Sequence, residues 1–412
     1  MHRERAVAYF EQALTALGHL PEGHEATGQA IDLRLDLYAP LFALNDFNRM
    51  GDLLHQAEDL AQNRQDRRRL GRFSAYMARY LWATVNHERA VEVGQRAYTI
   101  ATELKDVALQ AVANYTVAYA YHDLSIYGPA IELLRHNLAL LEGDLTRERL
   151  GQPFLPSVSS RTALAFCLGW QGEFPEAAAL IQEATRSAEA ADHLGSVAHA
   201  LQGGGLLYQL KGTLNEAIPR LERSLAMTKA NQTPPSTATL SILAHTYALA
   251  DRVAEALPLF DESLERAAAN RFLPCNSLWI GWWGEAALMA GRPEAAMQHA
   301  TRAVEISRAQ KERGYEAYAL RLLGKIAAHG HPPDVGQAET RYQQALARAD
   351  ELGMRPLQAH CHLDLGTLYG KTKQTGKVHA ELTTAIEFYR DMEMTFWLPQ
   401  AEATLAEVNG KP

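Results

Sequence analysis

The sequence predicts an all-α protein built as a solenoid of stacked helical hairpins, and two observations carry this prediction. First, an alanine recurs along the chain with spacings of 40, 47, 40, 39, 40 and 42 residues, and a valine continues the series after a further 40. A period of this length is typical of helix pairs that stack side by side. Second, a small residue precedes most of these positions by twelve, and a turn-forming residue often precedes them by five. The recurring positions are Ala90, Ala130, Ala177, Ala217, Ala256, Ala296, Ala338 and Val378.

The small residue and the recurring alanine explain how the two helices of a hairpin pack. Gly205 on a predicted first helix lets the second helix approach closely, and Ala217 lies opposite on that second helix. A tyrosine follows three positions after the small residue in several repeats, as Tyr208, Tyr247 and Tyr369. The pattern resembles the tetratricopeptide family, in its variants with a period of about 40 residues. The resemblance implies a right-handed superhelix whose first helices line a concave groove.

The predicted helices fill residues 1–412 as a single array. Residues 1–17 form a half hairpin, about nine hairpins follow over 25–390, and a helix over 396–408 caps the array. The spacing of 47 comes from an insertion at 143–156, and the spacing of 42 comes from extra residues at 330–333. We expect both to be surface loops that do not bind a partner. The expected hairpins span 25–62, 66–104, 106–142, 156–191, 195–230, 235–269, 274–310, 312–352 and 355–390.

The first predicted helix has no preceding helix to pack against, as in a fragment of a longer protein or in a gene that lost its front. Val7, Phe10 and Leu14 follow one another at helical spacing and would form an apolar stripe. We therefore expect the N-terminal half hairpin to be the weakest part of the array and a candidate surface for self-association.

Composition disfavours several classes of partner and compartment. The chain has 40 basic and 48 acidic residues, a net charge of −8, and no concentrated basic segment, which disfavours binding to nucleic acid or to a membrane surface. Its three cysteines are far apart and odd in number, so a reducing compartment is expected. The start is too charged for a signal peptide, and no apolar run approaches the ~20 residues of a membrane span. These features predict a cytoplasmic protein.

Three segments carry a narrower resemblance. Residues 277–282, 311–324 and 354–369 resemble the C-terminal repeat region of bacterial signalling proteins in which a nucleotide cyclase domain and a signalling ATPase domain precede the repeats. This sequence contains neither of those domains. The resemblance therefore implies a signal-transduction module without cyclase or ATPase activity of its own.

The sequence offers no set of residues for catalysis, a metal or a cofactor. Gly366, Gly370 and Lys371 come near a phosphate-binding loop, but the spacing between the glycines is one residue too short and the segment is a repeat helix. His360 and His362 lie two apart on a helix, so they point in different directions and cannot share one metal ion. We therefore expect a protein that is not an enzyme and has no metal or cofactor.

The superhelix predicts which side chains face its groove. The positions three before and one after each small residue should point inward, and they place apolar and aromatic groups in the middle with cations near both ends. Arg321 and Lys325 stand one helical turn apart and could together bind a carboxylate of a partner. The main candidates for partner binding are Arg79, Tyr115, Tyr119, Phe166, Gln202, His245, Glu285, Arg321 and Lys325.

Three functions fit this sequence. The first is a non-enzymatic scaffold or signal-sensing module that binds a protein or peptide segment in the groove. The second is a regulatory domain that recognises a small effector or short peptide, for which a closed pocket would be the distinguishing feature. The third is an accessory subunit of a signalling ATPase or cyclase. The cluster of Trp279, Trp282 and Trp283 fits either core packing or a binding surface.

Overall fold

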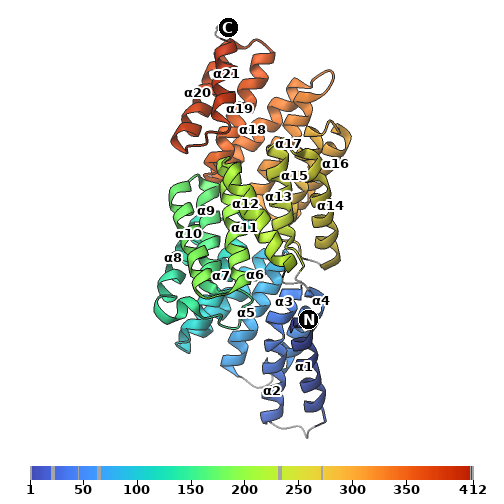
Figure 1. The fold of residues 1–412 in the computed structure, drawn as a ribbon, viewed down its shortest axis with the longest axis vertical. Helices are drawn as coiled ribbons and strands as arrows, with labels where there is room; N and C mark the ends of the chain where they lie inside the picture. The colour runs from blue at the N-terminus through green and yellow to red at the C-terminus, as the bar shows by residue number, and fades with distance from the viewer. Residues whose placement is uncertain are drawn as a thin grey trace.

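All regular elements in the described residues are helices, which confirms the predicted fold class. The computed structural model describes residues 2–19, 24–44, 46–62, 66–230, 234–270, 272–408 and 410, and residue 1 of the predicted half hairpin lies outside them. Each hairpin packs on the next, so that the array winds from α1 at one end of the molecule to α21 at the other (Figure 1). Within the described residues, α1 (His2–Leu17) comes first and α21 (Leu398–Val408) last. The pairs between them are α2 (His24–Asp36) and α3 (Tyr38–Leu44) with α4 (Phe47–Gln62), α5 (Arg67–Ala83) with α6 (His87–Glu103), α7 (Val107–Asp123) with α8 (Tyr127–Leu140), α9 (Pro156–Gln171) with α10 (Phe174–Ala190), α11 (Leu194–Lys211) with α12 (Leu214–Ala230), α13 (Thr237–Leu249) with α14 (Val253–Asn270), α15 (Asn276–Met289) with α16 (Pro293–Gln310), α17 (Arg313–His329) with α18 (Val335–Leu352), and α19 (Arg355–Lys371) with α20 (Thr375–Asp391).

The small residues allow the close helix contact that the sequence predicts. A Cβ added to Gly205 would lie 2.3 Å from the side chain of Leu221 on the partner helix. Added to Gly324, it would lie 2.6 Å from Tyr342. All seven recurring alanines and Val378 are fully buried. The periodic positions therefore form the internal seam of each hairpin.

The N-terminal region differs from the prediction in two ways. The first helix expected over 25–42 is divided into α2 and α3, which meet at Leu37. The stripe predicted for self-association packs against the chain itself, because Val7 is buried and Phe10 and Leu14 are partly buried in the main core. Helix α1 contacts both α2 and α3. The fold therefore covers much of the surface that we expected to be free.

Successive turns of the superhelix touch each other, which the repeat pattern does not predict. Residues between 182 and 227 positions apart in the sequence are joined by hydrogen bonds. The backbone N–H of Gly314 donates to Ser125 Oγ at 2.8 Å, and the backbone N–H of Leu273 donates to the carbonyl of Ala83 at 3.0 Å. Helix α9 also contacts α19. These inter-turn contacts tie successive turns of the superhelix together on the side of its interior.

The described helices include none with the length and apolar character needed to cross a lipid bilayer.

Candidate functional site

The interior of the superhelix contains two cavities. The N-terminal cavity has a volume of about 220 Å³ and is lined mainly by first helices from α5 to α17, together with the loops around Phe154, Pro235 and Phe272. The C-terminal cavity has a volume of about 400 Å³ and is lined by α11, α13, α15, α17 and α19, with Trp397 next to α21. Both lie on the side of the array formed by the first helices of the hairpins.

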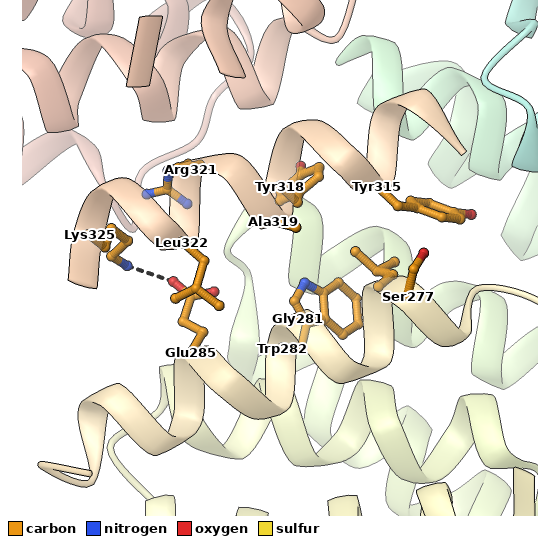
Figure 2. Close-up of a pocket in the computed structure, with 11 residues that line it drawn as sticks. Ser277, Gly281, Trp282, Glu285, Tyr315, Tyr318, Ala319, Arg321, Leu322 and Lys325 are labelled. Carbon is orange, nitrogen blue, oxygen red and sulfur yellow. Dashed lines mark hydrogen bonds and ion pairs between the residues drawn. The ribbon is translucent and has the colours of Figure 1, made fainter. Parts of the chain in front are cut away.

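A layer of side chains separates the two cavities. Helices α11, α13, α15 and α17 each contribute two residues one turn apart, of which the first lines the N-terminal cavity and the second lines the C-terminal cavity. Figure 2 shows α15 and α17 side by side, with Trp282 and Tyr318 facing the space between them. The pairs are Leu206 and Gln209, Ile242 and His245, Trp279 and Trp282, and Tyr315 and Tyr318.

Arg79 stands in an aromatic box at the wall of the N-terminal cavity. Its guanidinium carbon lies 4.0 Å from the ring centre of Trp82 and 4.8 Å from that of Tyr119. Tyr115 and Phe42 lie at 5.5 and 5.4 Å. Arginine is 6% exposed here, and its Nη1 has no hydrogen-bond partner among the described residues. Cation–π attraction stabilises this charge, but ring faces accept few of its in-plane N–H bonds.

Asp123 is the centre of a buried hydrogen-bond network that begins at the indole N–H of Trp82. Its Oδ2 accepts from Trp82 Nε1 at 2.8 Å, and its Oδ1 accepts from the Tyr315 hydroxyl at 3.0 Å. The indole of Trp170 can only donate, and it donates to His122 Nε2 at 3.0 Å. His122 Nδ1 therefore carries the hydrogen and donates to Asp123 Oδ1 at 2.9 Å. Burial alone would raise the pKa of the Asp123 carboxyl, but its donors outweigh burial and hold the pKa below its usual range.

A second buried pair joins the turns next to this network. His87 Nε2 lies 3.3 Å from Glu312 Oε1, and Ser277 donates a hydrogen bond to the other carboxylate oxygen. Burial alone would lower the pKa of His87, but the hydrogen bond to Glu312 outweighs burial and raises it above its usual value. Burial also raises the pKa of the Glu312 carboxyl. Outside this pair, Lys311 reaches Glu88 at 2.6 Å. These contacts hold the N-terminal end of α17 against the N-terminal end of α6.

The C-terminal cavity contains paired charges, which corrects one expectation. Arg321 Nε donates to Asp364 at 2.6 Å, and Lys325 reaches Glu285 at 2.6 Å, a contact visible in Figure 2. Burial alone would raise the pKa of the Glu285 carboxyl, but Lys325 and His245 hold it well below its usual range. Arg321 and Lys325 therefore do not form a free pair for one carboxylate of a partner, because each already has a carboxylate of its own.

The predicted groove residues divide between the two cavities. Four line the N-terminal cavity, namely Arg79, Tyr119, Phe166 and Gln202. Four line the C-terminal cavity, namely His245, Glu285, Arg321 and Lys325. Tyr115 lines neither of them, because its hydroxyl turns to Gln152 and donates to the side-chain oxygen at 2.7 Å.

The insertion at 143–156 is largely exposed over 143–151, whereas its last residues, 152–156, pack inward. After a short 3₁₀ helix, Gly143–Arg147, the chain buries Gln152 and places Phe154 in the wall of the N-terminal cavity. The ring of Phe154 stacks on His199 with centroids 4.9 Å apart. The expectation of an exposed loop without a role in the site was therefore wrong for 152–156, because Pro153 and Phe154 line the cavity. The shorter loop at 331–334 is exposed.

The three tryptophans of the cluster divide between cavity walls and packing on the outer helices. Trp279 and Trp282 are buried, and they line the N-terminal and C-terminal cavities, respectively. Trp283 instead packs on the outer helices, where its ring lies against His299 and its indole N–H donates to Asp261 at 3.1 Å. Two of the three rings therefore belong to the site.

Sequence reasoning missed the cavity residues near the C-terminal ends of the first helices. Trp82, His122, Asp123 and Trp170 lie four or five positions after the small residue of their repeat. These positions follow the predicted inward slot by about one helical turn, so they share its face. The helical periodicity that identified the inward-facing positions could also have identified these residues, one turn further along each first helix.

The comparisons with known proteins support the same fold. The family models and the curated proteins yield no match. Among solved structures, a Rap protein complexed with Competence and Sporulation Factor aligns with a TM-score of 0.65 at 15% identity, over 85% of this chain and 94% of that one. NprR in complex with its cognate peptide NprX aligns with a TM-score of 0.57 at 14% identity, over 84% and 99%. The protein therefore has a tetratricopeptide-like helical repeat fold, similar to the folds of Rap and NprR.

The narrower resemblance to signalling ATPases gains little from these comparisons. A signal transduction ATPase with numerous domains and a tetratricopeptide repeat sensor, from Pyrococcus horikoshii, aligns at 11% identity over 87% of this chain and 54% of that chain. Its TM-score of 0.44 is too low to support an argument beyond the repeat class.

Proposed function

We propose that this protein is a non-enzymatic signal-sensing module that binds a short peptide in the interior of its superhelix. The observation that carries the proposal is that the residues joining the turns also line the N-terminal cavity. Asp123 of α7 and Tyr315 of α17 hydrogen-bond at 3.0 Å, and both belong to the cavity wall. A ligand in this cavity contacts both turns at once, so its binding free energy favours the form in which the two turns are in contact.

A peptide fits the chemistry of the interior. The N-terminal cavity combines aromatic walls with hydrogen-bonding groups, among them Gln202 and the indole N–H of Trp279, which has no partner in the described residues. Peptide ligands are recognised by such a mixture of apolar pockets and backbone-binding polar groups. The solved Rap and NprR structures of similar fold contain a signalling factor and a cognate peptide, respectively.

The contacts between turns favour a sensor over an open scaffold. A scaffold that holds a long protein segment needs a groove open at its ends, whereas inter-turn contacts such as Gly314 with Ser125 bridge this one. The thiol in the described wall of the N-terminal cavity is not activated as a nucleophile. Cys275 lines the wall, but burial raises the pKa of its thiol well above the usual range, so it stays protonated.

Blocking the cavity tests the proposal. We would incubate the protein with a pool of random pentapeptides and measure retained peptide by native mass spectrometry. Ala198 lines the N-terminal cavity, so Ala198→Trp should fill it and abolish retention. Ala179 is exposed on the outer helix α10, so Ala179→Trp is the matched control and should retain peptide like the wild type. Equal retention by Ala198→Trp would contradict an interior site, and no retention by the wild type would contradict peptide binding.

A further inference from the structure

We infer that Arg79 binds a carboxylate of the ligand, and this inference rests on the proposed function. Helix α5 carries five arginines, of which Arg79 is nearest to its C-terminal end. Arg79 differs from Arg69 and Arg72 in lacking a carboxylate partner among the described residues. Its neighbours on the same helix, Arg69 and Arg72, pair with Asp32 at 2.7 and 3.2 Å. No such pair forms at Arg79 within the described residues.

A buried cation without an acid is costly, which makes it unusual in a structural role. Guanidinium stays charged at all ordinary pH values, so Arg79 cannot escape the cost by losing a proton. The four surrounding rings offset part of the cost through their π faces. The ring faces leave the in-plane N–H groups of the guanidinium without an acceptor. A carboxylate can accept two parallel hydrogen bonds from such a planar group.

The surroundings leave the charge of Arg79 unneutralised. Asp123 is the acidic residue of the N-terminal cavity wall in the described chain, but Trp82, His122 and Tyr315 already occupy its oxygens. His199, in the same wall, is neutral, because burial and then the charge of Arg79 lower its pKa to about 4. The region around Arg79 therefore carries one positive charge that is free to attract an anion.

The size and charge of the site favour a carboxylate over a phosphate. One guanidinium supplies a single positive charge, and the nearby Asp123 carboxylate would repel a dianion more strongly than a monoanion. The aromatic walls lower the local dielectric constant and so strengthen the attraction. The carboxylate can come from the C-terminus of the peptide or from an aspartate or glutamate side chain within it.

Three pentapeptide pools distinguish these sources. The first has free C-termini and no acidic residue, the second has amidated C-termini and one aspartate or glutamate, and the third has amidated C-termini and no acidic residue. Dissociation constants are measured by native mass spectrometry for the wild type, Arg79→Gln and Arg79→Lys. Arg72→Gln is the matched control, because it removes a cation from the same helix outside the cavity. Circular dichroism checks that each variant is folded.

We expect the wild type to bind the first or the second pool and to bind the third at least about tenfold more weakly, as for the loss of one charge-assisted hydrogen bond. Arg79→Gln should lose that preference, Arg79→Lys should keep part of it, and Arg72→Gln should keep all of it. Equal binding of all three pools by the wild type, or an unchanged preference in Arg79→Gln, would overturn the inference. If the third pool binds as tightly as the other two and Ala198→Trp abolishes that binding, the interior site stands while the role of Arg79 fails. If no pool binds, both proposals fail.

Discussion

Replacing Asp123 by asparagine should weaken the contact between turns of the superhelix. The carboxylate accepts from Trp82 at one oxygen and from His122 and Tyr315 at the other. An asparagine that keeps its oxygen for His122 and Tyr315 turns its NH₂ group toward the indole N–H of Trp82, so two donors face each other. Loss of the charged acceptor costs about 1.5–3 kcal/mol, and the unpaired buried N–H adds about 1–3 kcal/mol.

The sign of this effect follows from the pKa of Asp123. Burial would raise that pKa, but the folded protein lowers it, so the donors stabilise the charged form by more than burial destabilises it. Removing the charge therefore loses a net favourable interaction, and we expect Asp123→Asn to lower the free energy of unfolding by about 2.5–6 kcal/mol. The same contribution should be present above the unfolded pKa and disappear as the pH falls through the folded pKa.

Urea unfolding and small-angle X-ray scattering measure the two consequences. Asp106→Asn is the matched control, because Asp106 caps the same helix by accepting from the backbone N–H of Leu109, and asparagine caps helices equally well. Asp123→Asn should unfold at lower urea and show a larger radius of gyration, whereas Asp106→Asn should match the wild type. If both variants behave alike, the network does not hold the turns together.

Three further outcomes are expected. Gly205→Ala should destabilise by about 1–3 kcal/mol in thermal unfolding through overpacking, whereas Gly281→Ala, where the added Cβ meets only ordinary contact at 3.7 Å, should be neutral or stabilising. Because its partner Glu312 raises the pKa of His87, the wild type should lose stability relative to His87→Gln as the pH rises from 6 to 8, and parallel melting curves would contradict this. Arg321→Glu should lower the free energy of unfolding by about 3 kcal/mol or more, because it removes the partner of a nearly buried carboxylate, and an unchanged melting temperature would contradict it.

The fold could be predicted from the sequence because its determinants are local. Each hairpin needs a small residue, a turn and a buried alanine at fixed offsets, and these signals recur within one period. Gly205 and Ala217 show this, since both are buried at the contact between α11 and α12. Eight of the predicted groove residues line the cavities for the same reason, because helical periodicity alone fixes which face is turned inward.

The contacts between turns could not be predicted because they depend on small rotations added over many repeats. Asp123 and Tyr315 are 192 positions apart, and no local signal indicates that their helices meet. The pairing of Arg321 with Asp364 was missed for a related reason. The two residues occupy neighbouring first helices, 43 positions apart, so their contact depends on the offset between hairpins. Likewise, the inward course of 152–156 follows from the cavity that Pro153 and Phe154 line.

Hydrogen exchange with and without a saturating pentapeptide pool tests the central claim most directly. We predict slower exchange in the presence of peptide in the first helices α5, α7, α11 and α15, which line the N-terminal cavity, and at the contact of α7 with α17. The outer helices α6, α10, α14 and α16 should be unaffected. Protection confined to those outer helices, or peptide binding that leaves the α7 to α17 contact unprotected, would contradict a ligand site enclosed between the turns.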